Sequence, residues 1–151
     1  MNSPSANAKN SVVQEITINA TAKRVFEAII QPEVRLKWWW NGGGRFRLTH
    51  MESDLRVGGQ WTMRGVGHDE RPLSVSGKYH EIEPPHLLVF SWLPDWQDDG
   101  GETLVRWELE EHDGTTTVRL THSGFVSEKV RDGYRGWHHV LGGLQSFFDG
   151  G

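Results

Sequence analysis

The first part of the chain shows two hydrophobic periods in succession. Residues 12–20 alternate imperfectly between apolar and polar side chains, which predicts a first strand. The spacing of apolar residues then changes to three and four, and Thr21 stands where the N-cap of a helix is expected. Pro32 ends this helix and suits the first turn of a second short helix over residues 33–39, because proline is tolerated there but not in a helix interior. The apolar positions of the first helix are Val25, Phe26, Ile29 and Ile30.

From residue 44 to residue 123 the pattern is that of strands separated by turns. Apolar and polar side chains alternate with period two in most segments, whereas residues 87–93 are apolar on both faces. Asp113-Gly114, between the last two segments, is a strong hairpin signal, and strands joined in this way are antiparallel. Gly58-Gly59 precedes a strand and predicts a tight turn or bulge, since it lacks the pattern of a phosphate-binding loop. We predict strands over residues 60–65, 75–82, 87–93, 103–111 and 115–123.

The last segment, residues 127–148, returns to helical spacing and predicts one long amphipathic helix. The order of strand, two short helices, antiparallel strands and long C-terminal helix predicts an α+β fold in which a curved sheet wraps around that helix. A chain of 151 residues without an internal repeat or linker is expected to form one domain, here residues 12–150 after a disordered N-terminal tail, residues 1–11. The apolar stripe of the helix consists of Val130, Tyr134, Trp137, Leu141, Leu144 and Phe148.

Composition and charge exclude several classes of protein. The net charge of −4 offers no basic stripe for a nucleic-acid backbone, so we expect no nucleic-acid partner. No apolar run approaches the roughly 20 residues of a membrane-spanning helix, and the first residues lack the apolar core of a secretory signal. The absence of cysteine excludes a disulfide framework and fits a cytoplasmic location. The apolar content is unusual because 18 glycines and 8 tryptophans replace much of the aliphatic share.

Several blocks of the chain, in order and with consistent spacing, carry a resemblance that covers residues 13–148. They are ITINATAKRVFEAI, the step KWWW at 37–40, DLRVGGQW at 54–61, GKYHEIEPPHL at 77–87, WEL at 107–109 with GTT at 114–116, and GW at 136–137 followed by Leu141 and Leu144. On these blocks the chain resembles the Hsp90-ATPase-activator-homologue (AHSA1-like) branch of the START-like, or SRPBCC, superfamily. Where these proteins commonly have Gly-Pro after the tryptophans, residues 41–44 here read NGGG, and we expect a more mobile loop at the cavity mouth.

This resemblance implies a helix-grip (START/Bet v 1-like) fold, in which the sheet and the C-terminal helix enclose a cavity that often holds an apolar small molecule. It does not imply one activity, because the superfamily contains carriers, ligand sensors, cyclases and other enzymes. Aromatic side chains supply large apolar contact areas, so the tryptophans at 38–40 are candidates to wall the cavity, or else part of the core. Our full set of cavity candidates is Trp38, Trp39, Trp40, Trp61, Met63, Tyr79, Phe90, Trp107, His122, Tyr134 and Trp137.

Three hypotheses for function follow. The first is a binding module, a monomer or homodimer, that holds a small hydrophobic or aromatic molecule without a cofactor. The second is a polyketide-cyclase-like or other cavity enzyme with His122 or Tyr79 as acid or base, although a buried histidine or tyrosine is more often simply hydrogen-bonded. The third is an interaction protein like the Hsp90 co-chaperones; because these carry another domain before this one, we expect no binding to Hsp90. We predict no metal site, since the eight histidines show no ligand spacing, and no hydrolase nucleophile.

Overall fold

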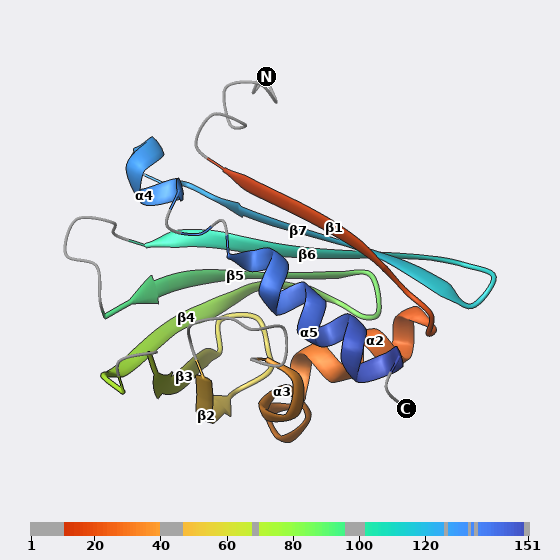
Figure 1. The fold of residues 1–151 in the computed structure, drawn as a ribbon, viewed down its shortest axis with the longest axis horizontal. Helices are drawn as coiled ribbons and strands as arrows, with labels where there is room; N and C mark the ends of the chain where they lie inside the picture. Colours follow the sequence, from red (N-terminus) through yellow and green to blue (C-terminus); the bar gives the residue numbers. More distant parts are fainter. Residues whose placement is uncertain are drawn as a thin grey trace.

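The computed structural model is an α+β fold in which a curled antiparallel sheet packs on a C-terminal helix (Figure 1). It describes residues 11–39, 47–67, 70–95, 102–125, 127–132, 134 and 136–149. The predicted N-terminal tail therefore lies outside the described residues, apart from Ser11. The elements are β1 (Val12–Ile18), α2 (Ala22–Ile30), α3 (Pro32–Trp38), β2 (Arg47–Ser53), β3 (Gln60–Val66), β4 (Pro72–Glu83), β5 (Leu87–Pro94), β6 (Thr103–His112), β7 (Thr115–Ser123), α4 (Glu128–Asp132) and α5 (Trp137–Asp149).

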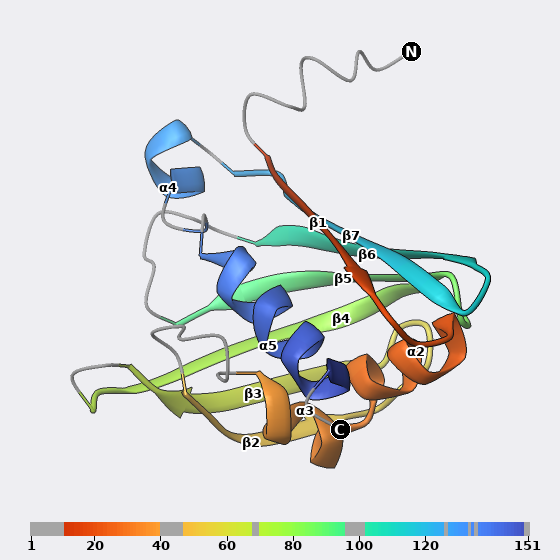
Figure 2. The same cartoon turned by 45° about the vertical axis from the view of Figure 1, so that its right-hand side comes forward.

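All neighbouring strands of the seven-stranded sheet are antiparallel, in the order β1-β7-β6-β5-β4-β3-β2. Helix α5 crosses one face of the sheet, and α2 and α3 lie beside its C-terminal half (Figure 2). We call the face that carries the helices the inner face. This arrangement is the α+β fold predicted from the order of elements, and it is the helix-grip fold that the resemblance implies.

Local signals place the two short helices as predicted. The Thr21 hydroxyl accepts a hydrogen bond from the backbone N–H of Arg24 (3.3 Å) and so caps α2. Pro32 is the first residue of α3, which begins one residue earlier than the predicted range. The indole of Trp38 then donates to the carbonyl of Ala28 (2.9 Å) and ties α3 to α2.

The hairpin between β6 and β7 also forms at the predicted position. Asp113 and Gly114 have φ of 53° and 81°, the left-handed conformations of a two-residue turn that matches the strand twist. Strand β2, in contrast, was not among the predicted strands. Its buried residues, Leu48 and Met51, are three positions apart because a register shift interrupts the pairing with β3, so period two is lost there.

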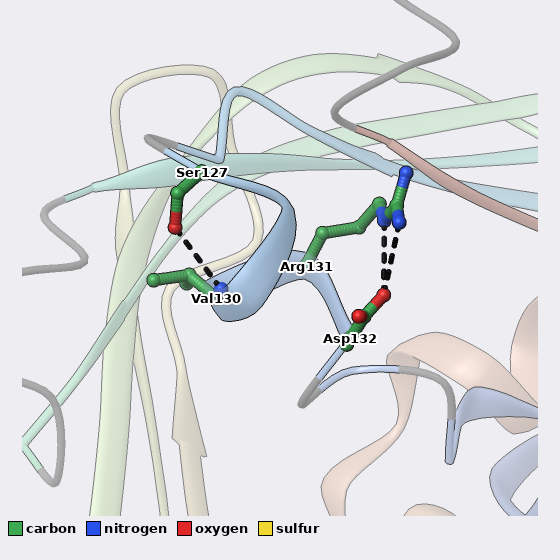
Figure 3. Close-up of polar contacts among 4 residues, drawn as sticks. All are labelled: Ser127, Val130, Arg131 and Asp132. Carbon is green, nitrogen blue, oxygen red and sulfur yellow. Dashed lines mark hydrogen bonds and ion pairs between the residues drawn. The ribbon is translucent and has the colours of Figure 1, made fainter.

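The single C-terminal helix predicted over residues 127–148 is wrong, because the structure has two helices there, α4 and α5. Ser127 precedes helix α4, and its hydroxyl accepts from the backbone N–H of Val130 (3.2 Å), while Arg131 donates to Asp132 at the end of the helix (Figure 3). The sequence places glycines at 133 and 136, between the two helices, and glycine disfavours the helical conformation by about 1 kcal/mol relative to alanine. The spacing of apolar residues continues across such a break, because it shows only which side chains are buried and not whether the helix is continuous.

The strand register places one row of side chains across the inner face. Tyr79 on β4 pairs with Phe90 on β5, which pairs with Val105 on β6, which pairs with His122 on β7. Residues directly opposite each other in antiparallel strands point to the same face, so this row faces the helices. All four side chains are buried.

Close packing on the inner face accounts for Gly77 on β4. A Cβ atom at this position would lie 1.8 Å from the carbonyl oxygen of Ser91 and 2.8 Å from the indole nitrogen of Trp61. Only glycine lets β5 and the Trp61 ring approach this closely.

Candidate functional site

The structure brings the predicted cavity residues together on the inner face and around the helices. Ten of the eleven candidates lie in the described residues, whereas Trp40 and the loop 41–44 lie outside them. Nine of these ten are buried, and Tyr134 is half-buried. Trp38 and Trp39, of the KWWW step at 37–40, have exposed fractions of 0% and 5% and therefore form part of the core. Trp107 is also 0% exposed.

Aromatic rings of the sheet and the helices form a continuous array. The centroid of the Trp137 ring, on α5, lies 5.4 Å from that of Trp92, 5.8 Å from that of Trp39 and 6.4 Å from that of Trp107. Trp92 in turn lies 5.8 Å from Trp61. These separations are in the range of favourable aromatic pairs, so the array links β3, β5, β6, α3 and α5. Trp92 is not among the candidates, although it follows the candidate Phe90 by two residues on β5 and therefore points to the same face.

His122 lies at the centre of a chain of hydrogen bonds inside the protein. The indole N–H of Trp137 donates to His122 Nδ1 (3.0 Å), and His122 Nε2 lies 2.6 Å from the Thr103 hydroxyl oxygen. The Thr103 hydroxyl donates to the backbone carbonyl of Trp92 (3.3 Å), and the Trp92 indole donates to the Tyr134 hydroxyl (3.1 Å). Since an indole only donates, His122 Nδ1 accepts, and the proton of the neutral ring is on Nε2, where it donates to Thr103.

This network keeps His122 neutral. Burial lowers the pKa of His122 from 6.5 to about 3, because the charged imidazolium would lose its hydration. Protonation would also place a hydrogen on Nδ1, opposite the indole N–H of Trp137. Burial similarly raises the pKa of Tyr134 to about 12, so that its phenol is neutral as well.

The two groups of the enzymatic hypothesis, His122 and Tyr79, are not brought together. They lie in the same row of the sheet but three strand spacings apart, about 14 Å along the sheet. Both ring nitrogens of His122 are engaged by the protein, and the Tyr79 hydroxyl lies 2.6 Å from the Ser53 hydroxyl. Neither group is placed to transfer a proton jointly with the other.

Two indole N–H groups on the inner face have no acceptor among the described residues. Trp61 is 2% exposed and Trp107 is 0% exposed, and the Nε1 atom of each is buried without a hydrogen-bond partner. A buried donor left unsatisfied costs about 1–3 kcal/mol. The indoles of Trp38, Trp92 and Trp137, in contrast, each donate a hydrogen bond. Among the described residues, the buried donors of Trp61 and Trp107 therefore need an explanation.

Arg35 is a buried charged residue of the inner region that was not among the candidates. It is only 2% exposed, and its Nε and Nη2 atoms both donate to the carbonyl of Ile29, at the end of α2. Its Nη1 atom donates to the thioether of Met63 (3.4 Å), and its guanidinium lies 5.2 Å from the centroid of the Trp39 ring. Burial lowers the pKa of Arg35 from 12.5 to about 10, with the nearby Tyr79 acting in the opposite direction, so the side chain is still charged at neutral pH.

A signal for Arg35 existed in the sequence. Residues three and four positions apart lie on one face of a helix, and Arg35 has this spacing to Trp38 and Trp39. The residue was not singled out because charged side chains are almost never fully buried unless paired. No ion pair joins Arg35 to a carboxylate of any described residue.

The opposite, outer face of the sheet carries a shallow groove of about 360 Å³ over β1, β6 and β7. Four of its charged side chains form two ion pairs, Arg119 with Glu15 (3.0 Å) and Arg106 with Glu108 (3.4 Å). Within the described part of the chain, no group of three or more histidine or acidic side chains is placed to hold a metal ion. No described helix combines the length and the apolar character needed to cross a membrane.

Comparison with known proteins gives a family and a fold. The family described as "Activator of Hsp90 ATPase homolog 1-like protein" matches residues 19–149. A search of curated proteins gives no match. Among solved structures, a protein from Rhodobacter sphaeroides is 20% identical, with a TM-score of 0.79 and 95% of each chain covered.

Two further structures agree. A protein from Arthrobacter aurescens is 21% identical, with a TM-score of 0.80, covering 95% of this chain and 88% of that one. An AHSA1-like protein from Aeromonas hydrophila is 20% identical, with a TM-score of 0.73, covering 93% and 92%. At these sequence identities the solved structures show the fold alone. The family model, in contrast, matches most of the sequence and shows the family. The chain therefore belongs to the activator of Hsp90 ATPase homolog 1-like family and has the helix-grip fold of the START-like superfamily.

Proposed function

We propose that this protein binds a small hydrophobic or aromatic molecule between the inner face of the sheet and the C-terminal helix. The observation that carries the proposal is the pair of unsatisfied indole N–H groups of Trp61 and Trp107. Both belong to the array of aromatic rings described above, which we call the aromatic layer. There a ligand would contact large apolar surfaces. A ligand oxygen that accepts from either indole removes the cost of a buried, unpaired donor.

The enzymatic alternative lacks a comparable observation. Its two groups are separated, and each already has a hydrogen-bond partner in the protein. We therefore propose binding without assigning a reaction.

The first test is a thermal-shift screen of the purified protein against aromatic and fatty compounds, together with native mass spectrometry of protein purified from its own cells. A ligand present at 100 times its Kd raises the free energy of unfolding by about 2.7 kcal/mol, which is readily seen as a higher Tm. We expect hits among aromatic compounds that carry an oxygen acceptor. A screen without any shift in Tm, together with native protein that carries no small molecule, would contradict the proposal.

The second test asks whether the indole N–H groups contact the ligand. We compare 2-acetylnaphthalene with 2-ethylnaphthalene, which differ in the oxygen acceptor, on wild type and on the variants Trp61→Phe and Trp107→Phe. Loss of the relevant N–H should weaken binding of the ketone about tenfold and leave the hydrocarbon nearly unchanged. Trp38→Phe is the matched control, because this indole already donates to Ala28 and should not alter the ratio of the two affinities.

A further inference from the structure

The guanidinium of Arg35 is a buried cation whose counter-charge is absent from the described residues. Removing an ion from water is expensive, and proteins normally offset the cost by pairing the ion with an opposite charge. Here the partners are one carbonyl oxygen, one thioether and one aromatic face. The negative ends of these partners help to hold the cation, but none of them carries a full charge.

The hydrogen-bonding capacity of Arg35 is only partly used. A guanidinium has five N–H donors, of which Nε carries one and each terminal nitrogen carries two. The contacts to Ile29 and Met63 use one N–H on each of the three nitrogens. One N–H on Nη1 and one on Nη2 are thus without an acceptor among the residues that the structure describes, and the bond to Met63 is weak because a thioether is a poor acceptor.

Arg35 adjoins the region where we propose that the ligand binds. Its guanidinium lies between the end of α2 and the inner face of β3, where Met63 follows Trp61 two residues along the same strand face. Trp61 supplies one of the unpaired indole N–H groups. The flexible, unbranched side chain of Met63 can change rotamer and give access to the guanidinium, since methionine adapts to irregular spaces.

We propose that the ligand of this protein is an acid, and that Arg35 receives its carboxylate while the aromatic layer receives its hydrophobic part. A carboxylate accepts two parallel hydrogen bonds from a guanidinium, one from each nitrogen, which matches the two unused N–H groups. The ligand class is therefore a small aromatic or aliphatic carboxylic acid. This inference rests on the proposed function, because it names the ligand class of the same site.

The test compares acids with amides of the same shape, 2-naphthoic acid with 2-naphthamide and dodecanoic acid with dodecanamide, by isothermal titration calorimetry at pH 7.5. For the wild-type protein we expect the acid of at least one pair to bind about 10- to 100-fold more tightly than its amide, as for a hydrogen-bonded charge pair. The variant Arg35→Met should lose this preference but bind the amide with nearly wild-type affinity. Arg64→Met is the matched control, because Arg64 follows Met63 on β3 but is exposed, and it should keep the preference.

The outcomes distinguish failure of the Arg35 inference from failure of the proposed binding function. If acid and amide bind wild type equally well, the inference about Arg35 is wrong and the proposed binding function stands. If the acid is preferred and Arg35→Met retains the preference, the carboxylate is held elsewhere and the inference is again wrong. If neither member of either pair binds and the thermal-shift screen is also empty, both proposals fail.

The ratio of the affinities for acid and amide also distinguishes ligand binding by Arg35 from a purely structural role. Loss of its bonds to the Ile29 carbonyl would change the stability of the protein, but it would not change the affinity for an acid relative to its amide. Should Arg35→Met not fold, the wild-type ratio is combined with Arg35→Lys, which retains the charge but not the two-nitrogen geometry. That variant should bind the acid more weakly than wild type and still prefer it to the amide. Equal affinity of the wild type for acid and amide would overturn the inference regardless of the variant.

Discussion

The neutral state of His122 makes a quantitative prediction about stability and pH. In the unfolded chain this histidine has its ordinary pKa of 6.5, whereas burial lowers the pKa in the folded protein to about 3. Between these values the unfolded state binds a proton that the folded state does not, so the free energy of unfolding falls as the pH falls. The stability associated with the neutral imidazole is complete above pH 6.5 and is lost progressively down to the folded pKa.

The expected size follows from the unfolded pKa alone at pH 5, because the folded state is still unprotonated there. At 1.5 pH units below 6.5, the loss relative to pH 7.5 is about 2 kcal/mol from this one residue. Other groups of the protein titrate over the same range, so the measurement must be a difference between two proteins. His122→Gln is the suitable variant, since its amide can accept from Trp137 and donate to Thr103 without titrating.

Urea unfolding of both proteins at pH 7.5 and pH 5 measures the difference. Wild type should lose about 2 kcal/mol more than His122→Gln between the two pH values. The control is His112→Gln, because His112 is exposed beside Glu110 on the β6–β7 hairpin and its removal should leave most of the pH dependence unchanged. If wild type and His122→Gln lost equal stability, the reasoning that His122 is buried and neutral would be refuted. Nitrogen NMR of the imidazole gives an independent check, with the proton expected on Nε2 throughout this range.

Three substitutions test the packing around the site, each by urea unfolding. Gly77→Ala should destabilise the protein by more than about 3 kcal/mol or prevent folding, because the new Cβ would lie 1.8 Å from the carbonyl oxygen of Ser91; a loss below 1 kcal/mol would contradict the close approach of β5. Gly142→Ala, with no atom within 4 Å of its Cβ and a position inside α5, should instead stabilise by up to about 1 kcal/mol, and a destabilised variant would contradict the open space there. Thr103→Val removes the acceptor of the His122 Nε2–H group and should cost about 2 kcal/mol, whereas an unchanged stability would show that this hydrogen bond is not formed.

The fold was predictable where local chemistry and tertiary packing agree. The Thr21 cap, the proline at the start of α3 and the Asp113-Gly114 turn each fix the backbone within a few residues, and the structure has all three. The prediction was wrong where the hydrophobic pattern shows which side of a segment is buried but not whether the helix or strand is continuous. The helical stripe of residues 127–148 runs through the break between α4 and α5, and the interrupted register of β2 hid a strand.

The candidate site was predictable as a set of buried aromatic residues but not as a set of donors and acceptors. Parity correctly placed His122 on the inner face with Val118 and Leu120. It could not show that both ring nitrogens of His122 would be satisfied, since Thr103 and Trp137 come from different elements and meet His122 only in the folded protein. A donor's partner depends on distances across the sheet, which the order of residues on a strand does not contain.

The polar groups inside this protein fall into two kinds, and the difference bears on what the inner region does. The hydrogen bonds of His122 and Thr103 are all made within the protein. They hold α5 against β6 and β7 and leave no donor or acceptor of His122 for a ligand. Trp61, Trp107 and Arg35 have N–H donors without an acceptor in the described part of the chain, and at about 1–3 kcal/mol for each unsatisfied buried group they lower the stability of the unliganded protein. Under the proposed function that deficit is recovered on binding. A ligand that supplies both a carboxylate and an apolar body should therefore raise Tm more than a hydrocarbon that fills the same volume.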